Sequence, residues 1–210
     1  VLTNTISVNY QPIIRIHDQK IVGVEVLSRW RDQKHGDVSP ELFIPLIKKI
    51  GLYKKYYSNI IEKSLSEIAP LAIKHQLIVS INVGHKEIED GQFITILRRA
   101  CFANHLPLSL MKVELSEKAV SAADILEGFC QELKSLGVKI SIDDFGTCYS
   151  SLSRLSELNF DKIKIDKSFV NPISTQDDAL NIVKLITGMA KSLNMRVIAE
   201  GVETEAQLER

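Results

Sequence analysis

Short apolar segments alternate with longer amphipathic segments along most of this chain, and this rhythm constrains the fold more than any other feature. The short segments are rich in β-branched residues and cover residues 77–83, 111–115, 138–143, 161–166 and 195–200. Between most of them, apolar residues recur every three or four positions, which is the period of a helix. Strands joined by helices pair in parallel, because each helix carries the chain back to the start of the next strand. The sequence therefore predicts one α/β domain built around a parallel sheet.

The beginning of the chain has a different pattern. Residues 6–16 and 20–30 have the composition of two strands with a short polar connection between them, which predicts a hairpin. The segment that follows, 39–51, is predicted to be a helix with Ser39 as its N-cap and Gly51 as its stop. Its apolar face consists of Phe43, Ile44, Ile47 and Ile50.

Another helix is predicted over residues 122–136, where Gly137 marks the end. Ser121 and Asp124 have the spacing of a capping pair at its start. The apolar residues that share one face of this helix are Ile125, Leu126, Phe129, Leu133 and Leu136. Further helices are expected over residues 93–104, 150–158 and 178–194.

Nearly every predicted strand after the first ends in a polar residue that its apolar pattern does not require. These residues are Glu25, Asn82, Glu114, Asp143, Lys164 and Glu200. An open doubly wound sheet places its ligand at one switch point, whereas a closed barrel collects residues from the ends of many strands. Successive residues of this set are separated by about 30 residues, the length of one βα unit of a barrel, apart from the first gap, which is longer and has room for two helices. We therefore expect an α/β fold of the TIM-like (β/α)8 barrel type.

The convergent residues carry the oxygen ligands of a hard divalent cation. Glutamate, aspartate and asparagine suit Mg²⁺ or Mn²⁺ and are poor ligands for a zinc cage. The adjacent carboxylates of Asp143 and Asp144 repel each other, and two neighbouring cations would stabilise both. Taken singly, Asp144 could cap the helix that follows it, Asn82 could belong to a turn, and Glu25 or Glu114 could be an exposed acid at a strand end. Their recurrence at successive strand ends favours a two-metal site.

Lys164 shares one face of its predicted strand with Lys162 and Asp166, so at least one lysine is expected to point into the domain. A buried ammonium group needs an anion beside it. That anion could be a bound ligand, or it could be Asp166 or Asp144 in a structural ion pair.

Charge restricts the partners of this chain. Its 26 basic and 26 acidic side chains give a formal net charge of zero. This balance argues against a broad basic field for DNA or RNA polymers, but it permits a small anionic ligand held by a few local cations. Arg29 could bind a phosphate in bidentate fashion, while the neighbouring Trp30 is expected to pack rather than to stack on a base.

The three cysteines include no C-x-x-C pair, which fits a reducing compartment, and we expect a cytoplasmic location. The sequence contains no apolar run long enough for a bilayer and no leader pattern. Because it begins with Val1 rather than methionine, we expect it to be a segment of a longer protein, with any sensory domain or membrane anchor outside it.

Several long motifs occur in a fixed order over almost the whole chain. They are YQPI, EVLSRWR, SPELFIPL, INVG, VELSE, SIDDFGTCYSSL, DKIKIDKSFV and AEGVETEAQLE. With these motifs the chain resembles the EAL-domain cyclic di-GMP phosphodiesterases. The resemblance implies a modified TIM barrel that uses Mg²⁺ or Mn²⁺ to cut one phosphodiester bond of cyclic di-GMP, giving linear pGpG.

The resemblance also implies roles for individual residues. The implied metal ligands are Glu25, Asn82, Glu114, Asp143 and Asp144, with Asp143 shared between two metals. The implied catalytic residues are Lys164, which would orient the attacking water, and Glu200, which would complete the site. The implied substrate contacts are Gln11 and Arg29, and Glu117 is implied to steady the loop after Asp144.

Departures from the family pattern bear on these expectations. EVL stands in place of EAL but keeps Glu25, Gly84 replaces a serine, and Cys148 replaces a glycine of the loop 145–151, which helps to form dimers in the family. The family continues with a helix, a last strand and a final helix. We therefore expect residues 1–210 to be an EAL phosphodiesterase domain with a modified first strand, lacking its last strand and helix, and to form a homodimer. The alternative is a catalytically inactive EAL domain that acts as a cyclic di-GMP receptor or protein-interaction module.

Overall fold

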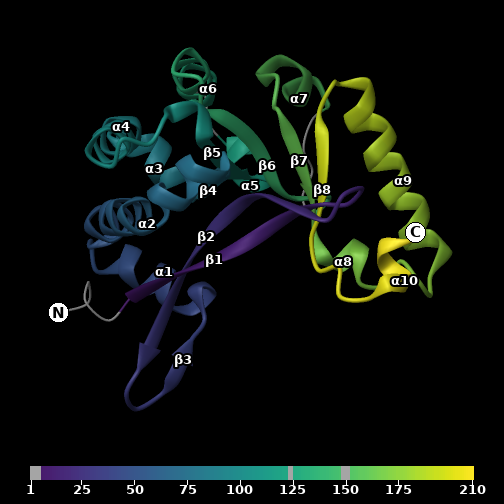
Figure 1. Ribbon diagram of the computed structural model, residues 1–210, viewed down its shortest axis with the longest axis horizontal. Coiled ribbons are helices and arrows are strands. Elements are labelled where there is room, and N and C mark those ends of the chain that lie inside the picture. Colours follow the sequence, from purple (N-terminus) through teal and green to yellow (C-terminus); the bar gives the residue numbers. More distant parts are fainter. Residues whose placement is uncertain (1–5, 123–124, 148–151) are drawn as a thin grey trace. The chain divides into compact units, whose positions relative to one another are not determined.

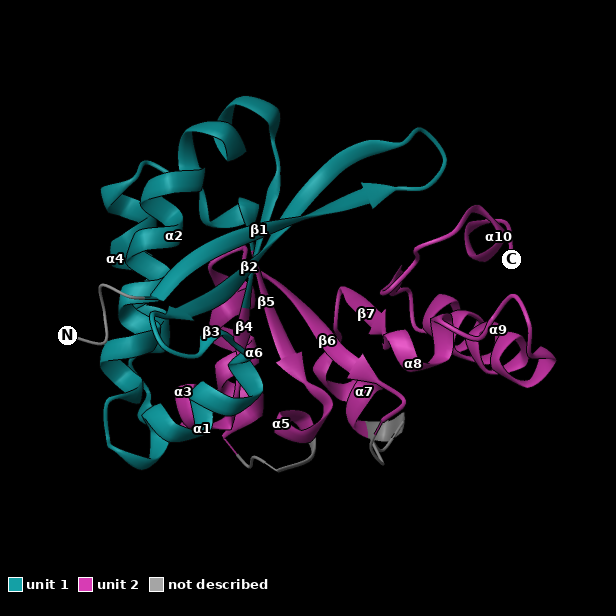
Figure 2. Cartoon of the chain, turned by 90° about the horizontal axis from the view of Figure 1, so that it is seen from below, with its two compact units in different colours: residues 1–81, 90–111 teal, residues 82–89, 112–210 magenta. Residues whose placement is uncertain are grey.

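The computed structural model describes residues 6–122, 125–147 and 152–210 (Figure 1). The chain divides into two compact units, shown in different colours in Figure 2. Unit 1 contains the described residues of 1–81 and 90–111, and unit 2 contains those of 82–89 and 112–210.

Unit 1 begins with the predicted hairpin. Strands β1 (Ile6–Arg15) and β2 (Lys20–Asp32) pair antiparallel. β2 also pairs antiparallel with the short β3 (Gly36–Val38) and parallel with β4 (Ile78–Val83). A glycine is required where β2 approaches β4, because a Cβ atom at Gly23 would lie 2.6 Å from the carbonyl oxygen of Ile78.

Two helices, α1 (Pro40–Lys49) and α2 (Tyr53–His75), lie between β2 and β4 in the sequence, as the length of that gap predicted. α1 begins at the predicted cap, where the Ser39 side chain accepts a hydrogen bond from the backbone N–H of Glu41. Phe43 and Ile47 are buried, but Ile50 is 57% exposed. The prediction for Ile50 was wrong because the helix ends at Lys49, so Ile50 belongs to the C-cap.

The core of unit 1 gathers aromatic and aliphatic side chains around Phe43. Trp30 packs edge to face on the Phe43 ring, with centroids 5.9 Å apart, which confirms that this tryptophan packs. The helix α4 (Phe93–Ala103) packs against α2 and is followed by a short 3-10 turn, Leu108–Leu110.

Unit 2 is built on four strands that pair in parallel in the order of the sequence. They are β5 (Met111–Ser116), β6 (Lys139–Phe145), β7 (Lys162–Ile165) and β8 (Arg196–Ala199). Val113, Ile140 and Ile163 lie at 0% exposure on one face of these strands, and Lys112, Glu114 and Lys164 are also buried. Burial of both faces is typical of parallel strands.

The remaining described helices fall into two groups by length. The long ones are α6 (Leu126–Ser135), α7 (Leu152–Leu158) and α9 (Asp177–Ser192), and the short ones are α3 (His85–Asp90), α5 (Glu117–Ala122), α8 (Lys167–Val170) and α10 (Glu205–Leu208). None of the short helices was predicted. In unit 2, α6 packs on β6, and α9 packs on β7 and β8.

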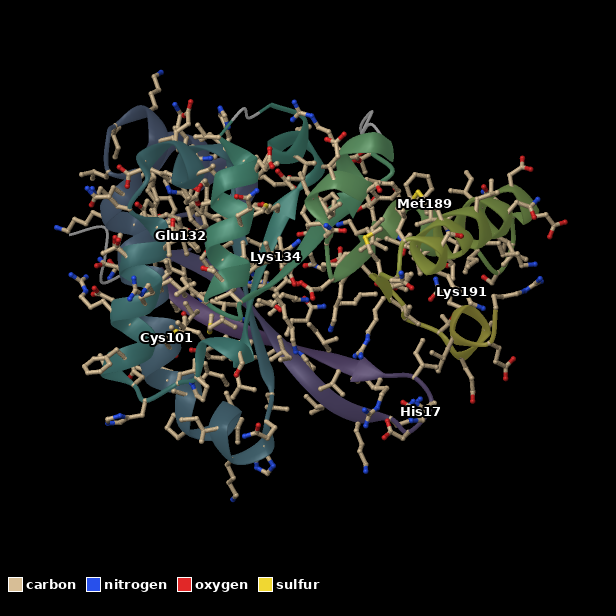
Figure 3. The ribbon with its side chains drawn as sticks, turned by 90° about the horizontal axis from the view of Figure 1, so that it is seen from above. His17, Cys101, Glu132, Lys134, Met189 and Lys191 are labelled. Carbon is tan, nitrogen blue, oxygen red and sulfur yellow. The ribbon has the colours of Figure 1, made fainter. Side chains whose placement is uncertain are left out.

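Helix α6 begins at Leu126 rather than at residue 122, and it buries Leu126, Cys130 and Leu133. Ile125, which was predicted on this buried face, is instead 50% exposed because it precedes the first turn. At the other end, Lys134 (Figure 3) donates to the carbonyl oxygens of Leu158 and Asn159, at 2.5 and 2.6 Å. A cation is favourable there because the carbonyl groups at the end of α7 lack helical partners.

Some predictions concern parts of the chain that the structure does not describe. These are Asp124 of the predicted capping pair, the helix start near residue 149, Cys148 and the end of the loop 145–151. Ser121 lies within α5, and the N-cap of α6 is Ile125, so the predicted capping of α6 by Ser121 was wrong. Within the described ranges, none of the helices has both the length and the apolar composition of a membrane span.

Candidate metal centre and active site

Lys164 of β7 is the central cation of a cluster of carboxylates in unit 2. Its side chain is 2% exposed, and its Nζ atom lies 2.6 Å from Glu114 Oε2, 2.9 Å from Asp143 Oδ1 and 2.6 Å from Glu200 Oε1. The three acids come from β5, from β6 and from the residue that follows β8. Parallel strands thus bring together residues that are far apart in the sequence, as the polar strand ends predicted.

One predicted partner of Lys164 was wrong. Asp166 caps α8, where its carboxylate accepts a hydrogen bond from the backbone N–H of Ser168 at 2.9 Å. The buried ammonium group of Lys164 instead pairs with the carboxylates of Glu114, Asp143 and Glu200.

Glu114 is fully buried and lies between two lysines of the same unit. Lys112 Nζ is 2.6 Å from Glu114 Oε1, and Lys164 Nζ is 2.6 Å from Oε2. The Lys112 contact is an ion pair without the alignment of a hydrogen bond. Burial by itself raises the pKa of Glu114, but Lys164 and Lys112 together hold that pKa below its usual value.

Lys112 was missed in the sequence, although a signal for it was present. It stands two residues before Glu114 in a strand, and side chains two residues apart point to the same face. A lysine with this spacing from a predicted buried acid is therefore a candidate partner of that acid.

Asp143 and Asp144 are adjacent, yet both can face one cation. The φ angle of Asp144 is +54°, in the left-handed region, so the regular alternation of side chains is broken there. One carboxylate oxygen each from Asp143, Asp144 and Glu200 lies within 4.8 Å of the others. This set of hard oxygen donors fits Mg²⁺ or Mn²⁺.

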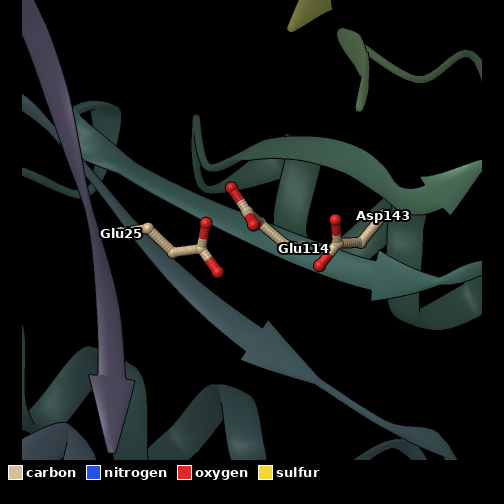
Figure 4. Close-up of side chains that lie close together, drawn as sticks. All are labelled: Glu25, Glu114 and Asp143. Carbon is tan, nitrogen blue, oxygen red and sulfur yellow. The ribbon is translucent and has the colours of Figure 1, made fainter. Parts of the chain in front are cut away.

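The two aspartates differ in environment. Burial raises the pKa of Asp143, although the nearby Lys164 ammonium group opposes this effect. Its Oδ1 atom also accepts a hydrogen bond from the backbone N–H of Asp144 at 3.0 Å. Asp144 is exposed. Figure 4 shows Asp143 with Glu114, whose carboxylates extend from the neighbouring strands β6 and β5.

The loop after Asp144 contacts Glu117, which is 2% exposed. Glu117 Oε2 accepts a hydrogen bond from the backbone N–H of Gly146 at 3.1 Å. Gly146 has a φ angle of +99°, and a Cβ atom there would lie 2.7 Å from the Phe169 ring. A glycine at this position is therefore required by both conformation and space.

The remaining predicted residues lie on other strands. In unit 1, Glu25 of β2 is 9% exposed and is the register partner of Gln11 on β1 and of Ser80 on β4. Gln11 and Arg29 are exposed, and Arg29 donates to the carbonyl oxygen of Ser28 at 2.9 Å. Asn82 is an exposed residue near the end of β4 and belongs to unit 2.

Comparisons with known proteins identify the family. The family model described as EAL domain matches residues 1–210. The oxygen sensor protein DosP of Escherichia coli K12 is 35% identical over 213 residues, which cover 100% of this chain and 26% of DosP. The probable cyclic di-GMP phosphodiesterase PdeD of the same organism is 33% identical over 199 residues, which cover 94% of this chain and 37% of PdeD.

Comparison with a solved structure indicates the same family. The PaMucR phosphodiesterase in complex with c-di-GMP has a TM-score of 0.91 to this chain at 32% identity, covering 98% of this chain and 85% of that one. EAL domains have a TIM-like barrel fold, so the predicted fold class is confirmed. The chain spans well under half the length of the curated relatives it matches. This chain belongs to the EAL domain family.

Proposed function

We propose that this chain hydrolyses one phosphodiester bond of cyclic di-GMP in a metal-dependent reaction that gives linear pGpG. The observation that carries the proposal is the group of Glu114, Asp143 and Glu200 around a single buried lysine. A charged group at low dielectric is costly, so such a concentration of ionised side chains is typical of a functional site. The similarity to PdeD, a probable cyclic di-GMP phosphodiesterase, and to the PaMucR phosphodiesterase in complex with c-di-GMP supports cyclic di-GMP as the substrate.

The donor set favours two divalent cations, Mg²⁺ or Mn²⁺. Asp143 and Asp144 would hold one of them, near Glu200. The family motif assigns Glu25, Asn82, Glu114 and Asp143 to the other. When bound, the cations would neutralise the phosphate and make water a better nucleophile.

Lys164 is proposed to position the attacking water. An ammonium group has three N–H donors, and the Nζ atom of Lys164 lies within ion-pair distance of three carboxylates. When Glu114 or Asp143 turns an oxygen to a cation, one of these donors becomes available to a water oxygen. Glu200, whose side chain is 28% exposed, is the most accessible of the three acids. Its carboxylate is proposed to accept a hydrogen bond from that water.

The proposed substrate contacts are Gln11 and Arg29, and Glu117 is proposed to support the loop after Asp144. An exposed guanidinium group with a planar fork of donors suits a phosphate oxygen pair. Beyond the site, we propose that the chain forms a homodimer, acts within a larger signalling protein in the cytoplasm, and does not bind DNA or RNA polymers. Light scattering on the purified chain would measure its molar mass and so test the dimer.

The rival function is a receptor that binds cyclic di-GMP without cutting it. Retention of Glu114, Asp143, Asp144, Lys164 and Glu200 favours the enzyme, because binding alone would not require all of them. The test is incubation with cyclic di-GMP and Mg²⁺, followed by chromatography for pGpG, with Asp143→Asn as the matched inactive control. Formation of pGpG by wild type alone is expected. Calorimetric binding of the nucleotide without any pGpG would instead favour the receptor.

A further inference from the structure

Two lysines contact the two oxygens of Glu114, and the structure separates their roles. Lys112 Nζ lies 2.6 Å from Oε1, and Lys164 Nζ lies 2.6 Å from Oε2. Each oxygen therefore faces one ammonium group. A divalent cation that binds Glu114 has to approach one of these oxygens, and repulsion from its ammonium group opposes binding unless that group turns away.

Lys164 has other carboxylates to which it can turn. Asp143 Oδ1 and Glu200 Oε1 lie 2.9 and 2.6 Å from its Nζ atom. It can therefore leave Oε2 of Glu114 and still keep two charged partners. The free-energy cost of that exchange is small compared with that of leaving a buried charge without a partner.

Lys112 has no comparable alternative. Its side chain is 0% exposed, and across the described ranges of the chain Glu114 is the one carboxylate within ion-pair distance of it. Its register partner on β6 is Lys139, and the cations Lys162 and Arg196 start the next two strands. Burial and then Lys112, Lys139 and Arg196 lower the pKa of Lys162 to about 8, in agreement with a strongly positive face.

We propose that Lys112 is a positioning residue that keeps Oε1 of Glu114 occupied, so that Glu114 offers only Oε2 to a divalent cation, and that its charge lowers the affinity of the site for that cation. This inference rests on the proposed metal-dependent function. Glu114 would then bind metal through one oxygen, and the metal would bind reversibly rather than permanently. The lysine acts through Glu114 and touches neither the substrate nor the reacting atoms.

The test is the dissociation constant of Mn²⁺, measured by isothermal titration calorimetry on the whole chain without nucleotide. Lys112→Met removes the charge and keeps a straight side chain. We expect Mn²⁺ to bind about tenfold more tightly, because even at the dielectric constant of water a unit charge a few ångströms from a dication changes affinity by roughly this factor. Lys112→Arg keeps the charge and should restore an affinity near that of wild type.

Lys139→Met is the matched control, because it removes one charge from the register partner without touching Glu114. It should change the affinity by less than about threefold, since a partly exposed charge is screened by solvent and salt. Lys112→Gln is a second variant in case the Met variant does not fold. It removes the charge, keeps an N–H donor for Oε1, and should also tighten binding.

The outcomes separate this inference from the proposed function. Wild type that binds no Mn²⁺ would overturn the metal site, and this inference with it. Wild type that binds Mn²⁺ while folded Lys112→Met or Lys112→Gln binds it equally or more weakly would overturn this inference alone. An equal gain of Mn²⁺ affinity in Lys139→Met would also overturn it, because the effect would then come from the positive charge of the strand starts in general and not from the contact between Lys112 and Glu114.

Discussion

The ammonium group of Lys164 does two things at different stages. It neutralises Glu114, Asp143 and Glu200, and in the reaction it is proposed to hold water. We predict that Lys164→Ala lowers turnover roughly a hundredfold or more but weakens nucleotide binding by less than about tenfold, because a water-positioning group contributes mainly in the transition state. Rates with Mg²⁺ and calorimetric binding with Ca²⁺ would measure the two effects. Equal losses in both would indicate a phosphate-binding role, and the exposed Lys167→Ala is the control.

Glu25 gives a second prediction for a single residue. Glu25→Ala should lower pGpG formation to below about a hundredth of the wild-type rate, because it removes a charged ligand proposed for the metal. The protein should remain folded by circular dichroism, since the substitution leaves the apolar side chains of β2 in place. Glu41→Ala, an exposed acid in the first turn of α1, should retain full activity. Full turnover by Glu25→Ala would remove Glu25 from the site.

Single residues also show what the sequence could and could not predict. The acids at the strand ends were identified because they interrupt an apolar pattern, and Glu114, Asp143 and Glu200 do lie around Lys164. Asp166 was named wrongly as a partner of Lys164, because the tilt and register of parallel strands decide which side chains meet, and a sequence does not record them. Lys112 could have been found from its spacing alone.

At the scale of elements, the strands of unit 2 begin with a row of cations. Lys112, Lys139, Lys162 and Arg196 lie at or near the starts of β5, β6, β7 and β8, and Lys162↔Arg196 and Lys112↔Lys139 are register partners. Like charges this close cost stability. The folded pKa of Lys162, about 8, lies below the ordinary lysine value of 10.5. The cost is therefore fully present below pH 8 and disappears as the pH rises toward 10.5.

We predict that Lys162→Gln raises the melting temperature at pH 7 by roughly 2–4 °C, which corresponds to about 1 kcal/mol after allowing for solvent screening of a partly exposed group. The gain should shrink at pH 9.5, where the wild-type side chain has already lost its proton in the folded state. Thermal melts at both pH values would measure it. Lys184→Gln, an exposed position on α9, should shift neither melt. A gain that is constant with pH would exclude the charge as its cause.

The helices predicted by position are those whose apolar residues repeat over several turns, because periodicity needs several turns to become visible. The longest helix, α2, was expected only as one of two helices that the gap after β2 had room for. The helices α3, α5, α8 and α10 have four to six residues and were not found. Such helices depend on caps and tertiary contacts: α8 begins at the Asp166 cap, and α10 at a capping box formed by Thr204 and Gln207.

At the scale of the whole molecule, metal binding should appear as stability. A ligand that binds only the folded state at 100 times its dissociation constant contributes about 2.7 kcal/mol. We predict that saturating Mn²⁺ raises the melting temperature by roughly 5–10 °C and that EDTA reverses this change. Asp143→Asn should lose most of the gain, because it removes a ligand proposed for both metals. A melt that does not respond to Mn²⁺ would contradict the site.

The β8 edge gives a further prediction at this scale. In the described part of the chain, β7 is the one strand that pairs with β8. An open edge presents unpaired backbone groups, and a further strand would cover it. We predict that a protein carrying one further βα unit of family-like sequence after residue 210, roughly 30–40 residues, melts higher and forms pGpG faster. Equal melting and turnover at matched concentration would show that β8 needs no further partner.

The chain passes between the two units at residues 81/82, 89/90 and 111/112, so neither unit is one continuous stretch of sequence. A recombination event with a single crossover therefore cannot exchange one unit between related genes while leaving the other intact. A crossover between 89/90 and 111/112, for example, would give unit 1 a helix or part of a helix from a second parent. Such hybrids would mix two sets of co-adapted core residues around Phe43 and α2. Neither unit alone can therefore be exchanged or engineered as one continuous piece of sequence.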